Sequence, residues 1–176
     1  MTAMQLIETR TLGTAQASIE FTSIPQTFTD LLVLVSARST GTADSGGAFC
    51  ELRPNSSTSG ITARALRGLG SGTQSTTETI LLIRINPSDY TASTFSNSSV
   101  YIPNYAGATN KSFSIDAVIE NNATVAQQQI LAGLWSNTAP ITSFLLVPGS
   151  GNFAADTMVS LYGVLKGSDG IVTTSP

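Results

Sequence analysis

The sequence predicts an all-β protein, built as a single antiparallel β-sandwich of the jelly-roll kind. Serine and threonine together make up 47 of the 176 residues, whereas lysine occurs twice and glutamate five times. Threonine favours strands and serine favours turns, and strong helix formers are scarce. Short apolar stretches alternate with turn clusters along most of the chain, which is typical of antiparallel β-proteins. No segment has the length of a crossover helix, so a parallel sheet is not expected.

The N-terminal half contains apolar stretches of strand length, separated by glycine, proline and serine. Ala17, Ile19 and Phe21 alternate with polar residues, which is the period of a strand with one buried face. The continuous apolar run within 30–38 predicts a strand that is covered on both faces. The glycine-rich segment 68–77 predicts a flexible loop. The expected strands are therefore 4–12, 17–22, 30–38, 48–53, 61–67 and 79–85.

The C-terminal half continues the same pattern. The dipeptide Pro103-Asn104 stops one strand, and the residues of 112–120 alternate strictly between apolar and polar. The segment 124–135 is predicted to be a strand because Gly133 weakens a helix, with a helical turn near 123–127 as the alternative. The expected strands here are 99–102, 112–120, 124–135, 141–147 and 158–165.

Length and composition indicate one domain over residues 1–176, with short flexible ends at 1–3 and 168–176. The apolar share of 41% can supply a core without disulfides or metals. The net charge is −3 and the few basic residues are scattered, so nucleic-acid binding is not expected. No apolar run reaches the length of a membrane span, and no signal peptide is recognised. We therefore expect a protein that is made in a cytoplasm and does not enter a membrane.

The residues needed for common enzyme chemistry are missing. The chain has no histidine, which excludes the Ser-His-Asp and Cys-His arrangements and histidine-based zinc sites. Its single cysteine, Cys50, is predicted to be a buried core residue. The carboxylates stand alone on polar strand faces or in turns, and no spacing indicates a pair for glycoside hydrolysis or a calcium loop. The sequence therefore predicts no enzyme, no cofactor and no metal site. Calcium held by oxygens in the turns around Asp44, Asp89 or Asp169 stays open as an alternative.

Aromatic residues beside amide-rich turns provide the candidate contact site. Tyr101, Asn104, Tyr105 and Trp135 could contact a glycan or a protein partner, because an aromatic ring beside an amide can stack on a sugar. The alternative, which we favour, is that the aromatic rings pack in the core or in a subunit interface.

Four stretches carry a resemblance to a known group of proteins: 23–32 (SIPQTFTDLL), 101–112 (YIPNYAGATNKS), 132–136 (AGLWS), and 151–153 (GNF) with 160–164 (SLYGV). They resemble virion proteins of tailed bacteriophages, which are small β-sandwich modules that decorate heads or form fibre-like appendages. The motifs are turn and strand signatures, and the group has no catalytic residues to transfer to this chain.

The resemblance implies a capsid decoration, or cement, protein on the outer surface of the virion. Such a protein binds the major capsid protein and stabilises the assembled head by bridging its subunits. Analogy with the group also implies a homotrimer. The alternative function is a tail or head-fibre module that binds host-surface glycan. A third hypothesis, a glycan-degrading enzyme, requires two convergent carboxylates, of which the sequence gives no sign.

Overall fold

The computed structural model describes residues 4–43, 48–70, 72–122 and 126–165. The described residues form strands and loops, and none of them forms a helix that could span a membrane. The strands are β1 (Met4–Thr11), β2 (Ile19–Phe21), β3 (Asp30–Ser36), β4 (Ala48–Pro54), β5 (Ile61–Gly68), β6 (Thr73–Glu78), β7 (Leu81–Ile85), β8 (Asn97–Pro103), β9 (Lys111–Glu120), β10 (Ala126–Trp135), β11 (Phe144–Pro148) and β12 (Met158–Val164).

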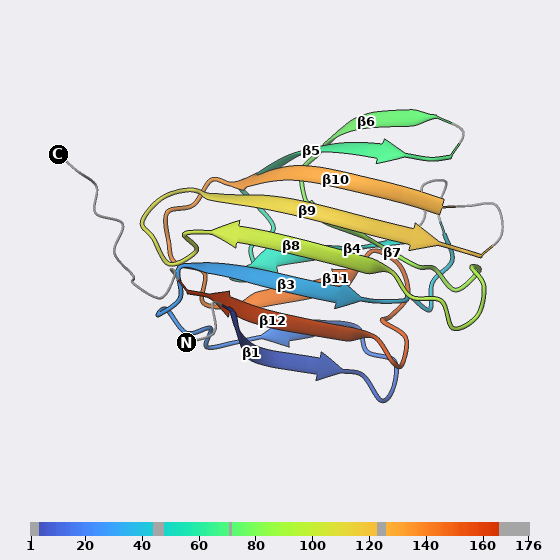
Figure 1. Ribbon diagram of the computed structural model, residues 1–176, viewed down its shortest axis with the longest axis horizontal. Coiled ribbons are helices and arrows are strands. Elements are labelled where there is room, and N and C mark those ends of the chain that lie inside the picture. Colours follow the sequence, from blue (N-terminus) through green and yellow to red (C-terminus); the bar gives the residue numbers. More distant parts are fainter. Residues whose placement is uncertain (1–3, 44–47, 71, 123–125, 166–176) are drawn as a thin grey trace.

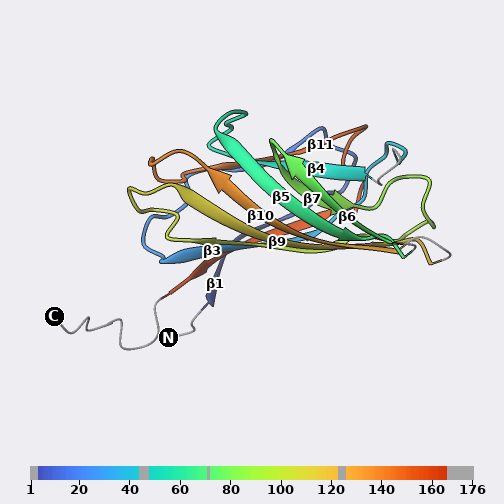
Figure 2. The ribbon, with the colours of Figure 1, turned by 90° about the horizontal axis from the view of Figure 1, so that it is seen from above.

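The strands form two antiparallel sheets that pack against each other (Figure 1, Figure 2). The larger sheet has eight strands in the order β1-β12-β3-β8-β9-β10-β5-β6, and the smaller has four in the order β2-β11-β4-β7. The predicted β-sandwich is therefore confirmed.

The topology is that of a jelly roll with two inserted hairpins. Without β5–β6 and β9–β10, the sheets have the orders β1-β12-β3-β8 and β2-β11-β4-β7. Each connection then crosses from one sheet to the other, except that between β4 and β7, which pair in the smaller sheet. The hairpin β9–β10 continues the larger sheet beyond β8, and β5–β6 completes it. The insertions thus double the width of one sheet and leave the other at four strands.

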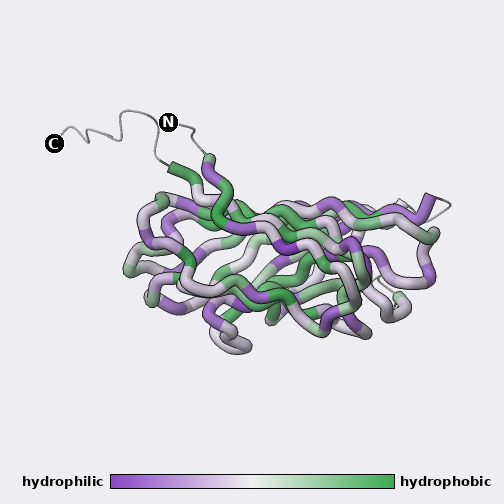
Figure 3. Tube along the Cα trace, turned by 90° about the horizontal axis from the view of Figure 1, so that it is seen from below, coloured by the Kyte–Doolittle hydropathy of each residue, from purple (hydrophilic) through white to green (hydrophobic). Residues whose placement is uncertain are grey.

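The core lies between the sheets and follows the strand period of two. Along β9, the residues alternate strictly between buried and exposed from Lys111 to Glu120, as the sequence pattern predicted. Hydrophobic and hydrophilic positions alternate along many strands in the same way (Figure 3). Trp135, Phe21, Phe144 and Phe153 are among the largest fully buried side chains.

Two sequence predictions are corrected by the structure. The segment 68–77 is not a flexible loop throughout, because Thr73–Glu78 forms β6, which pairs with β5 along its length. The strand β3 is covered on one face only, since Leu34 is 39% exposed while Val33 and Val35 are buried. The continuous apolar run of β3 predicted burial on both faces, but only one face of the eight-stranded sheet is covered by the second sheet.

The uncertain segment 124–135 forms β10 from Ala126 onward, so the strand prediction is confirmed. Residues 126–127 of the alternative helical turn belong to this strand, and residues 123–125 lie outside the described residues. The predicted flexible ends, 1–3 and 168–176, also lie outside them.

Candidate functional site: the outer face of the eight-stranded sheet

The exposed apolar side chains of this protein gather on one surface. The smaller sheet covers one face of the eight-stranded sheet, and we call the opposite face the outer face (Figure 1). Every large hydrophobic residue that is exposed in the described part of the chain points to the outer face: Met4, Leu6, Leu34, Leu66, Tyr101, Val118, Ile130, Leu134 and Met158. Scattered exposed apolar residues are normal, but a set confined to one sheet face indicates a binding surface.

The strand register places five of these side chains in two adjacent cross-strand rows. In one row, cross-strand neighbours run from β1 to β6 through Leu6, Tyr162, Leu32, Tyr101, Ser114, Ala132, Arg64 and Thr77. The adjacent row contains Thr9, Ser160, Leu34, Ser99, Asp116, Ile130, Leu66 and Ser75. Apolar and hydroxyl side chains dominate both rows, and each row carries a single charge.

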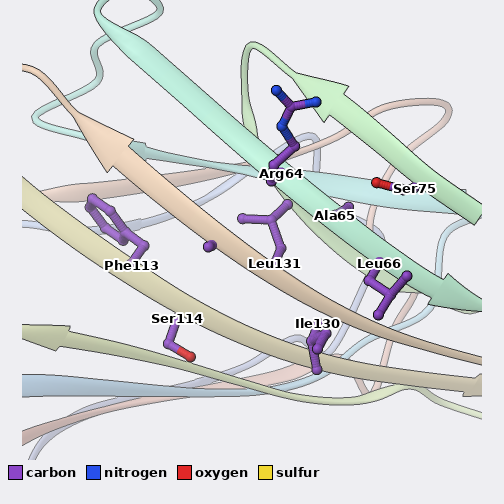
Figure 4. A pocket seen from close by; sticks show the side chains of 9 residues that line it. Arg64, Ala65, Leu66, Ser75, Phe113, Ser114, Ile130 and Leu131 are labelled. Carbon is purple, nitrogen blue, oxygen red and sulfur yellow. The ribbon is translucent and has the colours of Figure 1, made fainter.

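A shallow hollow of about 300 Å³ lies in this face over the two inserted hairpins (Figure 4). It is lined by the small side chain of Ala132 and by outward-facing residues of the four strands: Arg64, Leu66, Ser75, Ser114 and Ile130. The Arg64 guanidinium donates a hydrogen bond of 2.6 Å to Thr77 Oγ1. The hollow can accept an apolar side chain from a partner, with a fixed positive charge beside it.

Two of the four predicted contact residues lie together at the end of this face where β3 begins. The Tyr101 hydroxyl donates a 2.6 Å hydrogen bond to Asp30 Oδ2, and the backbone N–H of Asn104 donates one of 2.9 Å to Asp30 Oδ1. The hydrogen bond to Asp30, with desolvation and the charge of Asp30, raises the pKa of Tyr101. Asn104 has a φ of 50°, and its side-chain amide donates to Thr109 Oγ1. Asp30 therefore orients both residues, and the Tyr101 ring remains 40% exposed.

The other two predicted contact residues are buried. Tyr105 is fully buried, its hydroxyl donates to the Pro25 carbonyl, and burial raises its pKa. Trp135 is 2% exposed and belongs to the core. Neither ring offers a surface on which a ligand could stack, so the candidate contact set narrows to Tyr101 and Asn104. The core-packing alternative applies to both: Trp135 points inward from β10, and Tyr105 packs into the core from the turn after β8.

The cysteine thiol and three of the glutamates have well-defined surroundings in the structure. Burial raises the pKa of the Cys50 thiol to about 12, so the thiolate, which is the nucleophilic form, is almost absent at neutral pH. Within the described residues, no group of three cysteine, aspartate or glutamate side chains is placed to hold a metal. Glu8, Glu51 and Glu78 each form an ion pair with an arginine.

Sequence reasoning did not find the outer face, although a signal was present. In β10, apolar residues occupy both sets of alternate positions: Leu131 and Trp135 point inward, while Ile130 and Leu134 point outward. A strand that is apolar on both sides would normally be covered on both faces. The sequence predicts no amphipathic helix or third sheet that could cover the second face, so one apolar face of the sheet should remain exposed.

Comparisons of the chain with models of protein families, with curated proteins and with solved structures find no match.

Proposed function

We propose that this chain is a structural protein that decorates the outside of a bacteriophage capsid. The outer face of the eight-stranded sheet is the surface by which it attaches to the capsid protein. The observation that carries the proposal is that the exposed large apolar side chains of the described residues are confined to this face.

The size of the face suits a specific protein interface. Eight strands spaced about 4.8 Å apart and each about 23 Å long give roughly 800 Å² of sheet. A stable interface buries about 800 Å² on each partner. The outer face therefore has enough area for one such contact per subunit.

The charge of the face also supports attachment to a protein. Among the described strand residues, Asp30, Arg64, Asp116 and Glu120 are the charged side chains on the outer face. Interface cores are depleted in charged residues and enriched in apolar and aromatic ones. A surface with so little charge loses little hydration free energy when another protein covers it.

The role in the virion rests on the four stretches that resemble tailed-phage virion proteins. The jelly roll is frequent in viral capsid and lectin domains, and function is set by the site and not by the fold. A decoration protein binds only the assembled shell, so its binding free energy stabilises that shell.

The test is the binding of purified protein to capsids that lack it. We expect wild-type protein to bind and to increase the resistance of the capsids to heat and osmotic shock. A Leu66→Ser/Ile130→Ser variant should bind at least about tenfold more weakly, because it removes two apolar side chains beside the hollow. Glu20→Ser, an exposed change on the smaller sheet, is the matched control and should bind as wild type.

Equal binding of the outer-face variant and wild type would show that attachment uses another surface. Capsids that remain equally fragile with and without the protein would end the decoration hypothesis. Quantitative mass spectrometry of virions adds a third criterion, since decoration of the whole shell requires a copy number of the same order as that of the major capsid protein.

Tyr101 gives specific support to a second candidate function, the binding of host-surface glycan. Its exposed ring is held by Asp30 next to Asn104, and aromatic rings beside amides can bind sugars. A glycan array tests this function with wild type and Tyr101→Ala. Binding of a glycan by wild type but not by the variant would support glycan recognition. Absence of binding to any glycan on the array would rule it out.

A further inference from the structure

The two sheets end in four edge strands, and they are protected to different degrees. The eight-stranded sheet ends at β1 and β6, and the four-stranded sheet ends at β2 and β7. An edge strand presents unpaired N–H and C=O groups that another chain can pair with. Proteins normally protect such edges with charges, bulges, short strands or a cover.

Three of the four edges carry such protection. In β1, the register shifts between Leu6 and Glu8, and Glu8 pairs with Arg10 at 2.7 Å. The strand β2 has only three residues. All five residues of β7 are buried, so its edge is covered by the rest of the protein.

The remaining edge, β6, has none of these features. Its sequence from Thr73 to Glu78 contains no proline, and its pairing with β5 has no register shift. Its one charged residue, Glu78, stands at the end of the strand and pairs with Arg67 at 2.7 Å. The strand lies at the outermost position of the sheet (Figure 1).

An internal network holds β6 in an extended conformation. Arg67 is 6% exposed, and its guanidinium donates to Gln129 Oε1, Glu78 Oε1 and Gln74 Oε1. Thr76 Oγ1 donates to the same Glu78 oxygen at 2.8 Å. The edge is therefore ordered before any partner arrives, which lowers the entropy cost of pairing.

The hairpin geometry shows which backbone groups of β6 are free. The N–H of Leu69 donates to the C=O of Gly72, which closes the β5–β6 turn with a hydrogen-bonded pair. Hydrogen-bonded and non-bonded pairs alternate along an antiparallel ladder. The backbone groups of Gln74 and Thr76 therefore point to β5, whereas those of Thr73, Ser75 and Thr77 point away from the sheet.

We propose that β6 pairs with β6 of a second copy of this chain, antiparallel and about a two-fold axis at Ser75. In this register Thr73 of each copy faces Thr77 of the other, and the two Ser75 residues face each other. All three free residues of each strand are then hydrogen-bonded, and β-branched residues form cross-strand pairs. The two eight-stranded sheets become one continuous sheet.

The charges of β6 favour this partner and this direction. An antiparallel pair centred on Ser75 places Glu78 opposite Gly72 of the second copy, whereas a parallel pair would bring the two Glu78 side chains together. The two-fold relation also makes the same surface complementary to itself. The inference goes beyond capsid decoration and favours a two-fold dimer over the threefold assembly that the resemblance implies.

The experiment measures self-association of the full chain by sedimentation and native mass spectrometry. We expect a wild-type dimer whose amides at 73–78 exchange more slowly with deuterium at high protein concentration than at low concentration. In Ser75→Pro/Thr77→Pro, the free edge loses two N–H donors while the β5 ladder keeps its own, so the dimer should dissociate at least about tenfold more readily. Ser75→Ala/Thr77→Ala keeps both N–H groups and is the matched control; it loses only side-chain pairs, so it should weaken the dimer much less than the proline variant does.

A monomeric wild type, a trimer, or a dimer with unprotected 73–78 amides would overturn the proposal. So would a proline variant that dimerises as wild type. The exchange measurement on wild type needs no variant, so a folding defect in the proline variant leaves the test intact. The capsid-binding assay tests the proposed function independently of this inference. The β6 edge can fail to pair while the outer face still binds capsids, and capsid binding can fail while β6 still pairs.

Discussion

The two faces of the eight-stranded sheet are built from alternate residues of the same strands, yet they differ in what they contact. The inner face packs on the smaller sheet, and Leu131, Ile115 and Leu161 on it are at most 3% exposed. The outer face carries Ile130 and Leu34, which are 53% and 39% exposed. Apolar content alone therefore does not decide which face is the core. The comparison shows that the core is the face that has a second layer, and that the other face is available to another protein.

The largest expected difference between the two faces is in how much a truncated side chain lowers the free energy of unfolding, and two neighbouring residues of β10 allow the comparison. Leu131→Ala should lower the free energy of unfolding by about 2–5 kcal/mol, because it leaves a cavity between the sheets. Ile130→Ala should lower it by less than about 1 kcal/mol, because the side chain is half exposed. Urea unfolding of both variants measures this, and equal losses would mean that the outer face is covered in the isolated protein.

A second expected difference concerns a glycine on the inner face of β12. A Cβ at Gly163 would lie 2.2 Å from the ring of Phe28, so the ring must move if alanine is introduced. Gly163→Ala should therefore destabilise the fold by about 1–3 kcal/mol through overpacking. Gly68, where an added Cβ meets nothing within 4 Å, is the matched control. Thermal unfolding compares the two, and a neutral Gly163→Ala would show that Phe28 has room to shift.

A third difference is in pH dependence and involves Lys111 at the inward-facing start of β9. Its Nζ is held by the carbonyls of Gly107, Thr109 and Thr138, and burial lowers the pKa of its ammonium below the ordinary 10.5. Between the lowered pKa and 10.5 the unfolded chain binds more protons, so this residue makes the free energy of unfolding rise with pH.

Lys111→Met removes this contribution while keeping every tyrosine. The free energy of unfolding of wild type minus that of the variant should rise with pH up to about 10.5, by at most about 1.4 kcal/mol per pH unit. Urea unfolding across this range measures it. A difference that does not change with pH would show that the ammonium keeps its ordinary pKa.

The smallest expected effect belongs to the outer face. Tyr101→Phe removes the hydrogen bond to Asp30 from an exposed position, so the free energy of unfolding should fall by about 1 kcal/mol or less. Tyr162→Phe on the same face is the matched control, since no partner of its hydroxyl is found among the described residues. A loss above about 2 kcal/mol for Tyr101→Phe would show that this end of the face is part of the stabilising core.

The fold was largely predictable because its signals are local. The alternation in 112–120 and 158–165 and the turn residues between strands required no knowledge of distant contacts. The strand β6 was missed because Thr-Gln-Ser-Thr-Thr-Glu has no apolar alternation. It is a strand because Arg67 of β5 binds Gln74 and Glu78 of β6 and also Gln129 of β10, a strand that lies far from β5 in the sequence.

The candidate site was only partly predictable. Tyr101 and Asn104 were identified from their sequence context, and the structure shows that Asp30 joins them from another strand. Trp135 and Tyr105 are also aromatic residues near amide-rich turns, yet both are buried. Aromatic residues suit cores and interfaces equally well, so sequence context could not separate these positions.

The sequence by itself determined the class of the fold, the inner residues of most strands and the lack of histidine chemistry, because these follow from composition and from a period of two. Tertiary structure decided the strand order, the width of the larger sheet and the identity of the uncovered face. These depend on pairing between strands such as β10 and β5, whose partners lie more than a third of the chain apart and leave no local pattern. The outer face and the β6 edge exist only after the two inserted hairpins have extended one sheet beyond the other.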